Sequence, residues 1–526
     1  MNAIAQHKRL QLLNLFGCAR ASIGQFMPVK CRLTTMAKVL PFSFCAAMLL
    51  GGCAVGPDYV RPAMQVPSAY KEDGDWKTAE PKDVDTKDHW WEYYGDAKLN
   101  ELVLQSNQAN QNILLAEAQY RRANALVDSA RAAYFPTAGV GLGDSRGRTV
   151  NSTPHVVNSH TASFTTSWEV DLWGGIRRSV EAGKANAQAS EADLAAARLT
   201  IQAAMVQDYI QLRITDQLKS LFADAIAAYA KSLHLTQVQF AAGVVTRSDV
   251  ALAETTLKSA QAQAIDLDVQ RTQLEHAIAV LIGKTPAEFS LEPAPFTIRI
   301  PSVPVGLPST LLERRPDISG AERRVAAANA NIGVARAAYY PNLLLGGSAT
   351  NTSLFQLFNS SPTLWSLGAT ATEVIFDGGA RAALGTQAVA SYDAAVAQYK
   401  QTVLSGFQEV EDNLAALRIL TQETEAQDDA VKSAQDAERI TMSQYRAGTA
   451  NFISVTTAQI LALTNERAAV QLRGRQFAAS VALIKAIGGS WFVAEQPGKQ
   501  EQSTQSAAST ESGSAAVPGD LQPAPR

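Results

Sequence analysis

Residues able to do catalytic chemistry are scarce in this sequence. None of the six histidines has the HxxxH or HExxH spacing by which one helix face presents two imidazoles to a zinc ion. No nucleophile, base and orienting acid can be recognised as a set. Gly139, Gly141 and Gly143 could suggest a nucleotide loop, but no helix with a phosphate-binding start follows them, which favours small strand residues facing a lumen. The sequence therefore predicts neither an enzyme nor a metal or cofactor site.

Net charge and hydropathy limit which other classes of protein this sequence could belong to. The 526 residues carry a net charge of −3, so nucleic acid is not an expected partner. No stretch after Cys53 has the roughly eighteen apolar residues of a transmembrane helix. If the chain crosses a membrane, we expect it to do so as strands.

The cysteines are informative because of where they lie. Cys18, Cys31 and Cys45 precede Cys53, and none follows it. Cys53 ends the run MAKVLPFSFCAAMLLGGC, in which a basic residue is followed by about twelve mostly apolar residues and then by small ones. This order is typical of a secretory signal, and the apolar part is too short to span a bilayer as a helix. We predict a signal peptide over residues 1–52, with Met36 as an alternative start.

The end of this run, LGGC, resembles the lipobox of bacterial lipoproteins, in which the cysteine is lipidated and becomes the new N-terminus. The resemblance implies a covalent lipid on Cys53 and a lipid-anchored segment over residues 53–97. Ala54 stands where an aspartate would hold an enterobacterial lipoprotein in the inner membrane, which favours the outer membrane. An ordinary signal peptide followed by a free thiol is the alternative.

Two copies of one pattern follow, 205 residues apart. Four landmarks recur in one order, three of them at this step and one, EVDLWGG with EVIFDGG, slipped by a residue. The three are SARAAYFP with VARAAYYP, FAAG with YRAG, and LIG with AIG. Such spacing indicates duplication. We assign residues 98–300 to the first repeat and 305–491 to the second.

Each copy predicts a long helical hairpin. Both contain a proline-free run of more than a hundred residues, and an interior proline would cost a helix about 3 kcal/mol. Apolar residues recur at threes and fours along 176–242 and 380–447, the pattern of a coiled-coil seam. Gly243 and Gly448 follow these runs, and glycine supplies the positive φ of a C-terminal cap. Because a second seam begins after each glycine, we expect each to be the tip of an antiparallel hairpin.

Between the helical runs the pattern changes to two-residue alternation. In TASFTTSWEVDL (161–172) apolar and polar residues alternate, which is typical of a strand that crosses a bilayer in a barrel. We predict one β-hairpin over 136–172 and a second, with weaker alternation, over 341–377. Two hairpins give four strands, too few to close a barrel, and an open edge is not tolerated in lipid. The chain is therefore expected to oligomerise in order to build a pore.

A proline begins each predicted hairpin, where it ends the helix and holds the preceding residue extended. The aromatic residues before it suit a membrane–water interface, or alternatively fill a core at the helix end. The junction residues are Tyr134, Phe135, Pro136, Tyr339, Tyr340 and Pro341.

The layout is similar to the outer-membrane factor family of tripartite efflux systems, the TolC-like proteins, and specifically to the NodT/OprM-type lipoproteins. The similarity extends from Cys53 to about Trp491. The motifs that carry it are CAVGPDYVRP, DHWWEYYGDAKLNELV, SWEVDLWGGIRRSVEA, LERRPDISGAERRVAAANANIGVARAAYYP, FQEVEDNLAAL and YRAGTANFISVTTAQ.

The resemblance implies a mixed α and β membrane protein with a tandem repeat. Three copies would form a twelve-stranded β-barrel, four strands per chain, that continues into a long α-helical coiled-coil barrel. It also implies a homotrimer in the outer membrane of a Gram-negative bacterium, in contact with outer-membrane lipid, with a large periplasmic part. A periplasmic adaptor and an inner-membrane pump of the RND type are the implied partners. The implied function is a passive duct for small molecules such as drugs and toxic compounds; an exit duct for type I protein secretion is the alternative.

The tips are assigned by the same resemblance. Gly243, Val244, Gly448 and Thr449 are the turn positions at which the adaptor would dock. In relatives, a constricting carboxylate stands one or two turns past the second-copy glycine.

This sequence departs from that pattern. The matching positions are the uncharged Ser454 and Thr457, while the aliphatic ring survives as Ile453. The first-copy tip carboxylate is present as Asp249. Its arginine partner in some relatives is replaced by Ala450, and Arg446 is an alternative partner that the sequence does not place. We expect a gate whose latch is not the charged one.

Two other classes of protein are alternatives to an efflux duct. A periplasmic coiled-coil lipoprotein without a pore would have no need of the strand alternation, and an enzyme would need a catalytic set that is not recognisable here. Residues 492–526, rich in Ser, Ala, Gln and Pro, predict a disordered tail.

Overall fold

The computed structural model describes residues 54–65, 67, 70–72, 89–148, 155–301, 314–351 and 363–489. The predicted signal peptide, Cys53 and the predicted tail lie outside these residues. Among the helices that the structure describes, none is long and apolar enough to cross a membrane.

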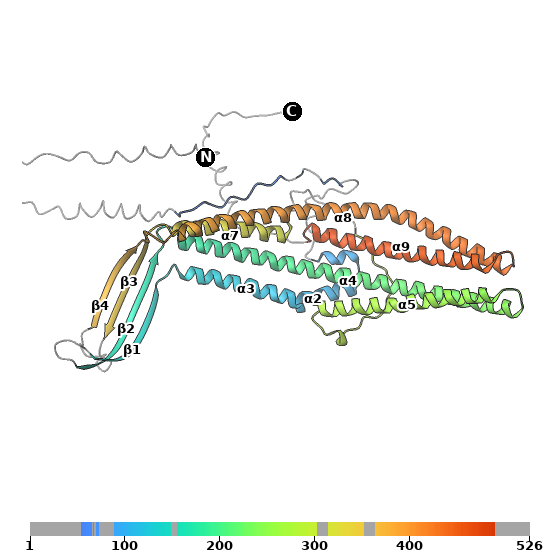
Figure 1. Ribbon diagram of the computed structural model, residues 1–526, viewed down its shortest axis with the longest axis horizontal. Coiled ribbons are helices and arrows are strands. Elements are labelled where there is room, and N and C mark those ends of the chain that lie inside the picture. The colour runs from blue at the N-terminus through green and yellow to red at the C-terminus, as the bar shows by residue number, and fades with distance from the viewer. Residues whose placement is uncertain are drawn as a thin grey trace, which may run out of the picture. The chain divides into compact units, whose positions relative to one another are not determined.

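The helices and strands occur as two matching sets (Figure 1). The first set comprises η2 (Trp90–Tyr94), α2 (Ala97–Ala109), α3 (Gln111–Ala132), β1 (Thr137–Arg148), β2 (Val156–Val170), α4 (Gly175–Ala241), α5 (Arg247–Leu281) and η3 (Pro286–Glu288). The second comprises α7 (Pro316–Ala337), β3 (Asn342–Asn351), β4 (Thr363–Thr372), α8 (Ala380–Arg446) and α9 (Phe452–Ala486).

The three helices that occur in both sets agree in length and spacing. Helices α3 and α7 both have 22 residues, α4 and α8 both have 67, and α5 and α9 both have 35. Each second-set helix begins 205 residues after its counterpart. The element pattern is consistent with the tandem repeat expected from the sequence. At 1.5 Å per residue, each 67-residue helix is about 100 Å long.

Neighbouring helices follow the order α3, α4, α7, α8, and the return helices α5 and α9 pack on α4 and α8. In Figure 1 the strands lie at one end of these helices and both hairpin turns at the other. The largest buried cluster joins α2, α4, α5 and α9, and includes Trp90, Tyr209, Phe222 and Phe477. A second cluster joins α7, α8 and α9.

The four strands form one antiparallel sheet in the order β1-β2-β3-β4. Its register pairs Val140 with Phe164 and Phe164 with Ala349, so large apolar side chains share one face. On this face Val140 is 78% exposed and Trp365 is 73% exposed. The sheet therefore presents an uncovered apolar surface.

The three glycines that could have suggested a nucleotide loop lie inside β1. A Cβ at Gly141 would come within 2.9 Å of Ser163 Oγ, and one at Gly143 within 2.8 Å of Thr161 Oγ1. Both hydroxyls donate to the carbonyl of the glycine opposite, at 3.3 Å. Glycine is needed here because the hydroxyl row of β2 lies over β1.

Both outgoing strands end earlier than the alternation predicts. β2 ends at Val170 rather than Leu172, and β4 ends at Thr372 rather than in EVIF. An aspartate turns the chain into the next helix in each case. Asp171 accepts bonds from the backbone N–H groups of Ile176 and Arg177, and Asp377 from those of Gly379 and Arg381. Satisfying these N–H groups at a helix start outweighs continued pairing of the strand.

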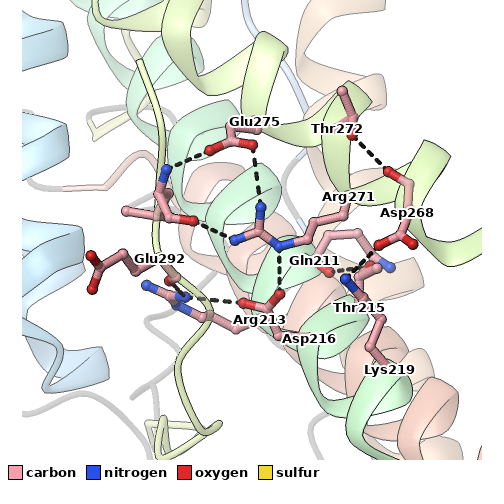
Figure 2. Close-up of polar contacts among 11 residues, drawn as sticks. Gln211, Arg213, Thr215, Asp216, Lys219, Asp268, Arg271, Thr272, Glu275 and Glu292 are labelled. Atoms are coloured by element: carbon pink, nitrogen blue, oxygen red, sulfur yellow. Dashed lines mark hydrogen bonds and ion pairs between the residues drawn. The ribbon is translucent and has the colours of Figure 1, made fainter. Parts of the chain in front are cut away.

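The connector after α5 is held by a buried polar network, shown in Figure 2. From α5, Arg271 donates to the backbone carbonyl of Leu291, and Glu275 accepts from the N–H of Leu291. Arg271 also bonds to Asp216 of α4 at 2.7 Å. Both polar groups of the Leu291 backbone are thus bonded to the hairpin.

Asp216 also holds a second guanidinium group. Arg213 donates to Asp216 at 3.1 Å and to the carbonyl of Glu292 at 2.8 Å. The side chains of Arg213 and Asp216 are 5% and 4% exposed. A charge buried this deeply is tolerated only when it is paired, so Asp216 holds both arginines in place.

The described residues before η2, 54–65, 67 and 70–72, lie along the helices. Val55 N donates to the carbonyl of Trp173 at 3.0 Å, next to the end of β2. Tyr59 donates to Glu322 of α7, and Glu72 pairs with Arg418 of α8. The segment therefore follows the helices away from the strands.

Candidate functional site at the helical tips

Both predicted tip turns are glycine caps of the same kind. Gly243 and Gly448 have φ values of 74° and 77°. The N–H groups of Gly243 and Val244 bond back to the carbonyls of Phe240 and Gln239, and Gly448 and Thr449 repeat the pattern. This is the Schellman arrangement, which requires the left-handed residue that glycine supplies. The return helices α5 and α9 begin a few residues later.

The turns present exposed side chains. Val244 is 71% exposed and Thr449 is exposed, as are the preceding apolar residues Val238 and Phe240. A turn with uncovered apolar side chains can dock a partner. The adaptor contact expected at these positions stays a prediction.

Asp249 and Ser454 occupy the same position of their repeats, the third residue of the return helix. Asp249 Oδ2 accepts bonds from the backbone N and Oγ1 of Thr246, at 2.9 and 2.8 Å. In the second repeat the Ser454 hydroxyl donates to Oδ1 of the capping Asn451 at 2.7 Å. Both side chains thus cap the first turn of a helix within their own hairpin.

The other predicted gate residues lie along the same face of α9. Ile453 is 59% exposed, and the exposed Thr457 donates its hydroxyl to the carbonyl of Ile453 at 2.8 Å. Arg446 is exposed at the end of α8, and no ion pair of Arg446 occurs within the described ranges. Ile453 is therefore the uncovered apolar side chain of this turn.

A buried polar contact joins the two hairpins near the tips. Tyr445 of α8 is 4% exposed, and its hydroxyl donates to Gln239 of α4 and lies 3.3 Å from Thr236 Oγ1. The Tyr445 ring packs at 5.5 Å from Phe452, with Ala253 and Val455 around it. Sequence reasoning missed this contact, although Tyr445 of YRAG has a hydroxyl that Phe240 of its repeat FAAG lacks.

The polar seam continues further from the tips. Tyr229 of α4 donates to the carbonyl of Gln459 at 3.1 Å, and the Gln459 amide donates to Ser232 at 3.0 Å. Burial raises the pKa of Glu438 in α8, and the nearby Glu466 of α9 raises it further. The like charge of Glu466 disfavours the ionised form of the half-buried Glu438 carboxyl. The bonds of Tyr229 and Ser232 with Gln459 are a polar part of the contact between the repeats.

At the opposite end, the prolines separate helix from strand as predicted. Helix α3 ends at Ala132 and β1 begins at Thr137, with Pro136 between them; Pro341 has the same place before β3. Phe135 is 69% exposed and Tyr340 is 43% exposed. Phe135, Tyr339 and Tyr340 are therefore not part of a buried core within the described residues.

Two tryptophans that the sequence analysis did not assign to these junctions complete them. Trp168 Nε1 donates to the carbonyl of Tyr134 at 3.0 Å, and Trp173 Nε1 donates to that of Pro341 at 2.8 Å. The Trp173 ring stacks on Tyr340 at 4.7 Å. Ala54 packs against Gly174 at the same junction. An aromatic group of this kind, at the end of an apolar sheet, is typical of a membrane–water interface.

No group of three or more His, Cys, Asp and Glu side chains that could hold a metal ion occurs among the residues that the structure describes.

Comparison with known proteins identifies similar chains. A family model described as outer membrane efflux protein matches residues 102–284 and again 307–489. The pyoverdine export outer membrane protein OpmQ of Pseudomonas aeruginosa is 29% identical over 457 residues, 85% of this chain and 96% of the relative. The outer membrane protein OprJ of the same species is 30% identical, over 85% of this chain and 94% of its own. The solved structure of the outer-membrane channel OprN superimposes with a TM-score of 0.78 at 30% identity, covering 83% of this chain and 99% of that one.

Proposed function

Because the chain belongs to the outer membrane efflux protein family, we propose that it is the outer-membrane duct of a tripartite efflux pump. The duct is passive, and carries small molecules such as drugs and toxic compounds from an inner-membrane pump and a periplasmic adaptor to the outside. The main support for this function is that the family model matches the chain twice. The two matched segments begin 205 residues apart, as the repeated helices do.

Three copies would close the pore. The described part of each chain contributes four strands, and β1 and β4 are edge strands with no strand partner on their outer sides among these residues. Such edges are not tolerated in lipid, so they pair with further copies. The family resemblance sets the number at three, which gives twelve strands and a coiled-coil barrel of helices below them.

The tips face the partners. The exposed turns at Gly243–Val244 and Gly448–Thr449 support adaptor docking there. The inner-membrane pump is of the RND type by resemblance. Relatives are named for pyoverdine export, toluene efflux and antibiotic efflux, so the substrates differ between similar ducts. Selection by the pump rather than the duct accounts for this variety.

The gate is hydrophobic. Three Ile453 side chains around the axis would exclude water from a narrow pore. Ser454 and Thr457 carry no charge, and their hydroxyls bond within their own helix. Asp249 is held by its own cap, so it does not serve as a free latch.

The chain is anchored by a lipid on Cys53. The lipid anchor is supported by the position of the residue that follows Cys53. Ala54 packs against Gly174, beside the stacked rings of Trp173 and Tyr340. A lipid attached there starts at the level of the aromatic junction, where acyl chains begin.

Conductance and export together test the duct. The purified protein in planar bilayers should conduct ions, and expression in a strain lacking its own outer-membrane duct should restore resistance to small toxic compounds. A periplasmic coiled-coil lipoprotein without a pore would do neither. Restored secretion of a protein, without restored resistance, would instead support the type I secretion duct.

A further inference from the structure

Charged side chains continue the apolar face of the sheet at its end far from the helices (Figure 1). On this face of β1, the apolar Val140 and Leu142 are followed by three charged residues. These are Asp144, Arg146 and Arg148, and all three are exposed. Because alternate residues of a strand point to the same side, the charged side chains extend the apolar surface rather than turn to the opposite, glycine-lined side.

Two of these charges have no acidic partner. Asp144 lies opposite His160 of β2, and its Oδ1 is 3.0 Å from Nδ1 of that imidazole. Arg146 and Arg148 lie opposite an asparagine and a valine of β2. No ion pair of either arginine occurs among the residues that the structure describes. Since alternate Cα atoms of a strand are about 7 Å apart, the two guanidinium groups can contact the same anionic molecule.

The arginines lie at the depth where an apolar band of a barrel ends. Trp168 marks the end of the sheet next to the helices, where its Nε1 donates to the carbonyl of Tyr134. Arg146 pairs with Asn158, ten residues before Trp168 in β2. Ten residues extend about 33 Å along a strand, and about 26 Å along the membrane normal at a tilt of roughly 40°. The apolar band of outer-membrane barrels is about 25 Å tall, so Arg146 lies at its far edge and Arg148 beyond it.

The second hairpin offers no equivalent pair of arginines. Residues 342–372, which include β3 and β4, contain no charged residue. A role in forming the hairpin would be needed in both repeats, yet only the first has these side chains. The two arginines are therefore not a requirement of the hairpin fold.

We propose that Arg146 and Arg148 bind the phosphate groups of a phosphorylated glycolipid, lipid A, in the outer leaflet of the membrane. The inference rests on the proposed outer-membrane duct, since the duct places the helices in the periplasm and the far end of the sheet at the outer leaflet. A guanidinium group donates two parallel hydrogen bonds to a phosphate, which an ammonium group does not. The acyl chains of the same lipid lie against Val140 and Leu142, so one molecule contacts both parts of the face.

Native mass spectrometry of the full-length protein tests this site. The protein, released from detergent after incubation with bisphosphorylated lipid A, should retain this lipid. It should retain the dephosphorylated form about tenfold less, because a hydrogen bond to a charged group contributes roughly that factor in affinity. Equal retention of the two forms would overturn the proposal, and this comparison needs no variant. Equal retention of phosphatidylglycerol, an anionic phospholipid, would overturn the assignment to a glycolipid.

Paired variants locate the contact. Arg146→Gln with Arg148→Gln should reduce the retained lipid A by about tenfold. Arg146→Lys with Arg148→Lys keeps the charges but not the paired donors, so it should retain an intermediate amount. The control, Arg439→Gln with Arg475→Gln, removes two exposed arginines of α8 and α9 and should retain as much as the unmutated protein. An equal loss in the control would mean that total charge, not this site, holds the lipid.

Conductance in planar bilayers separates the failure of the site from the failure of the duct. A protein that retains lipid A through its phosphate groups but does not conduct would uphold the site and contradict the duct. A protein that conducts but retains no lipid A would uphold the duct and contradict the site.

Discussion

The hydroxyl of Tyr445 lies 3.3 Å from Oγ1 of Thr236, and both side chains are buried. Tyr445 belongs to α8 and Thr236 to α4, so the contact joins the two hairpins three residues before the tip glycine at 448. If the tips open, we expect the hairpins to separate at this point. The contact would then stabilise a closed arrangement.

Tyr445→Phe should raise resting conductance. The variant keeps the ring among its apolar neighbours but removes the hydroxyl that reaches Gln239 and Thr236. A buried hydrogen bond contributes about 1 kcal/mol, which corresponds to about fivefold in the closed–open equilibrium of each chain. Single-channel recording measures the change. Phe240→Tyr, at the repeat-equivalent and exposed position, is the control that should leave conductance unchanged.

Ile453→Ala should also raise resting conductance, because a smaller ring of apolar side chains excludes water less well. The unmutated duct should show little block by divalent cations from the periplasmic side. Thr457→Asp should create such a block, since three carboxylates around the axis bind cations. Strong block before mutation would mean that another acidic ring, Asp249 for instance, lines the constriction.

Asp208→Asn should stabilise the protein at neutral pH. Burial in α4 raises the pKa of Asp208 to about 6, above that of the unfolded chain. The folded state therefore binds more protons between about pH 4 and pH 6, and its stability falls as the pH rises through that range. The second repeat already has asparagine at this position, Asn413.

The melting temperature of Asp208→Asn should exceed that of the unmutated protein at pH 7.5 and approach it near pH 4. Asp224→Asn, which changes an exposed carboxylate of the same helix, is the control. A gain of equal size at both pH values would contradict the role of ionisation.

Asp216→Ala should destabilise the connector. It leaves the guanidinium groups of Arg213 and Arg271 buried without their shared carboxylate, and breaking a buried pair costs about 3–5 kcal/mol. We expect a lower melting temperature and faster protease cleavage near Leu291. Asp268→Ala removes the more exposed pair with Lys219 and should cost less than about 1 kcal/mol. Equal effects of the two variants would contradict the network.

Cys53→Ser should leave an unprocessed precursor that incorporates no labelled fatty acid. Unchanged labelling would reject the lipid anchor. Because the strands themselves would hold the chain in the membrane, export activity should fall only in part.

The features that the sequence predicts correctly are local ones. Pro136 and Pro341 separate helix from strand because a proline ring acts on the residues directly around it. Gly243 and Gly448 cap helices because glycine alone among the residues of each turn adopts a positive φ without strain. The duplication can be recognised because three short landmarks keep one spacing and a fourth differs from it by one residue.

Only the tertiary structure decides which distant side chains meet. Tyr445 and Thr236 are 209 residues apart, and no local preference links them. The sharing of Asp216 by Arg213 and Arg271 likewise depends on groups brought together by folding. Ala185 and Ala390 make the distinction clearest, since each is the alanine at the same position of equivalent helices, α4 and α8. One is buried and the other exposed because burial is set by the neighbouring helix, and the described part of the chain supplies that neighbour to α4 but not to α8.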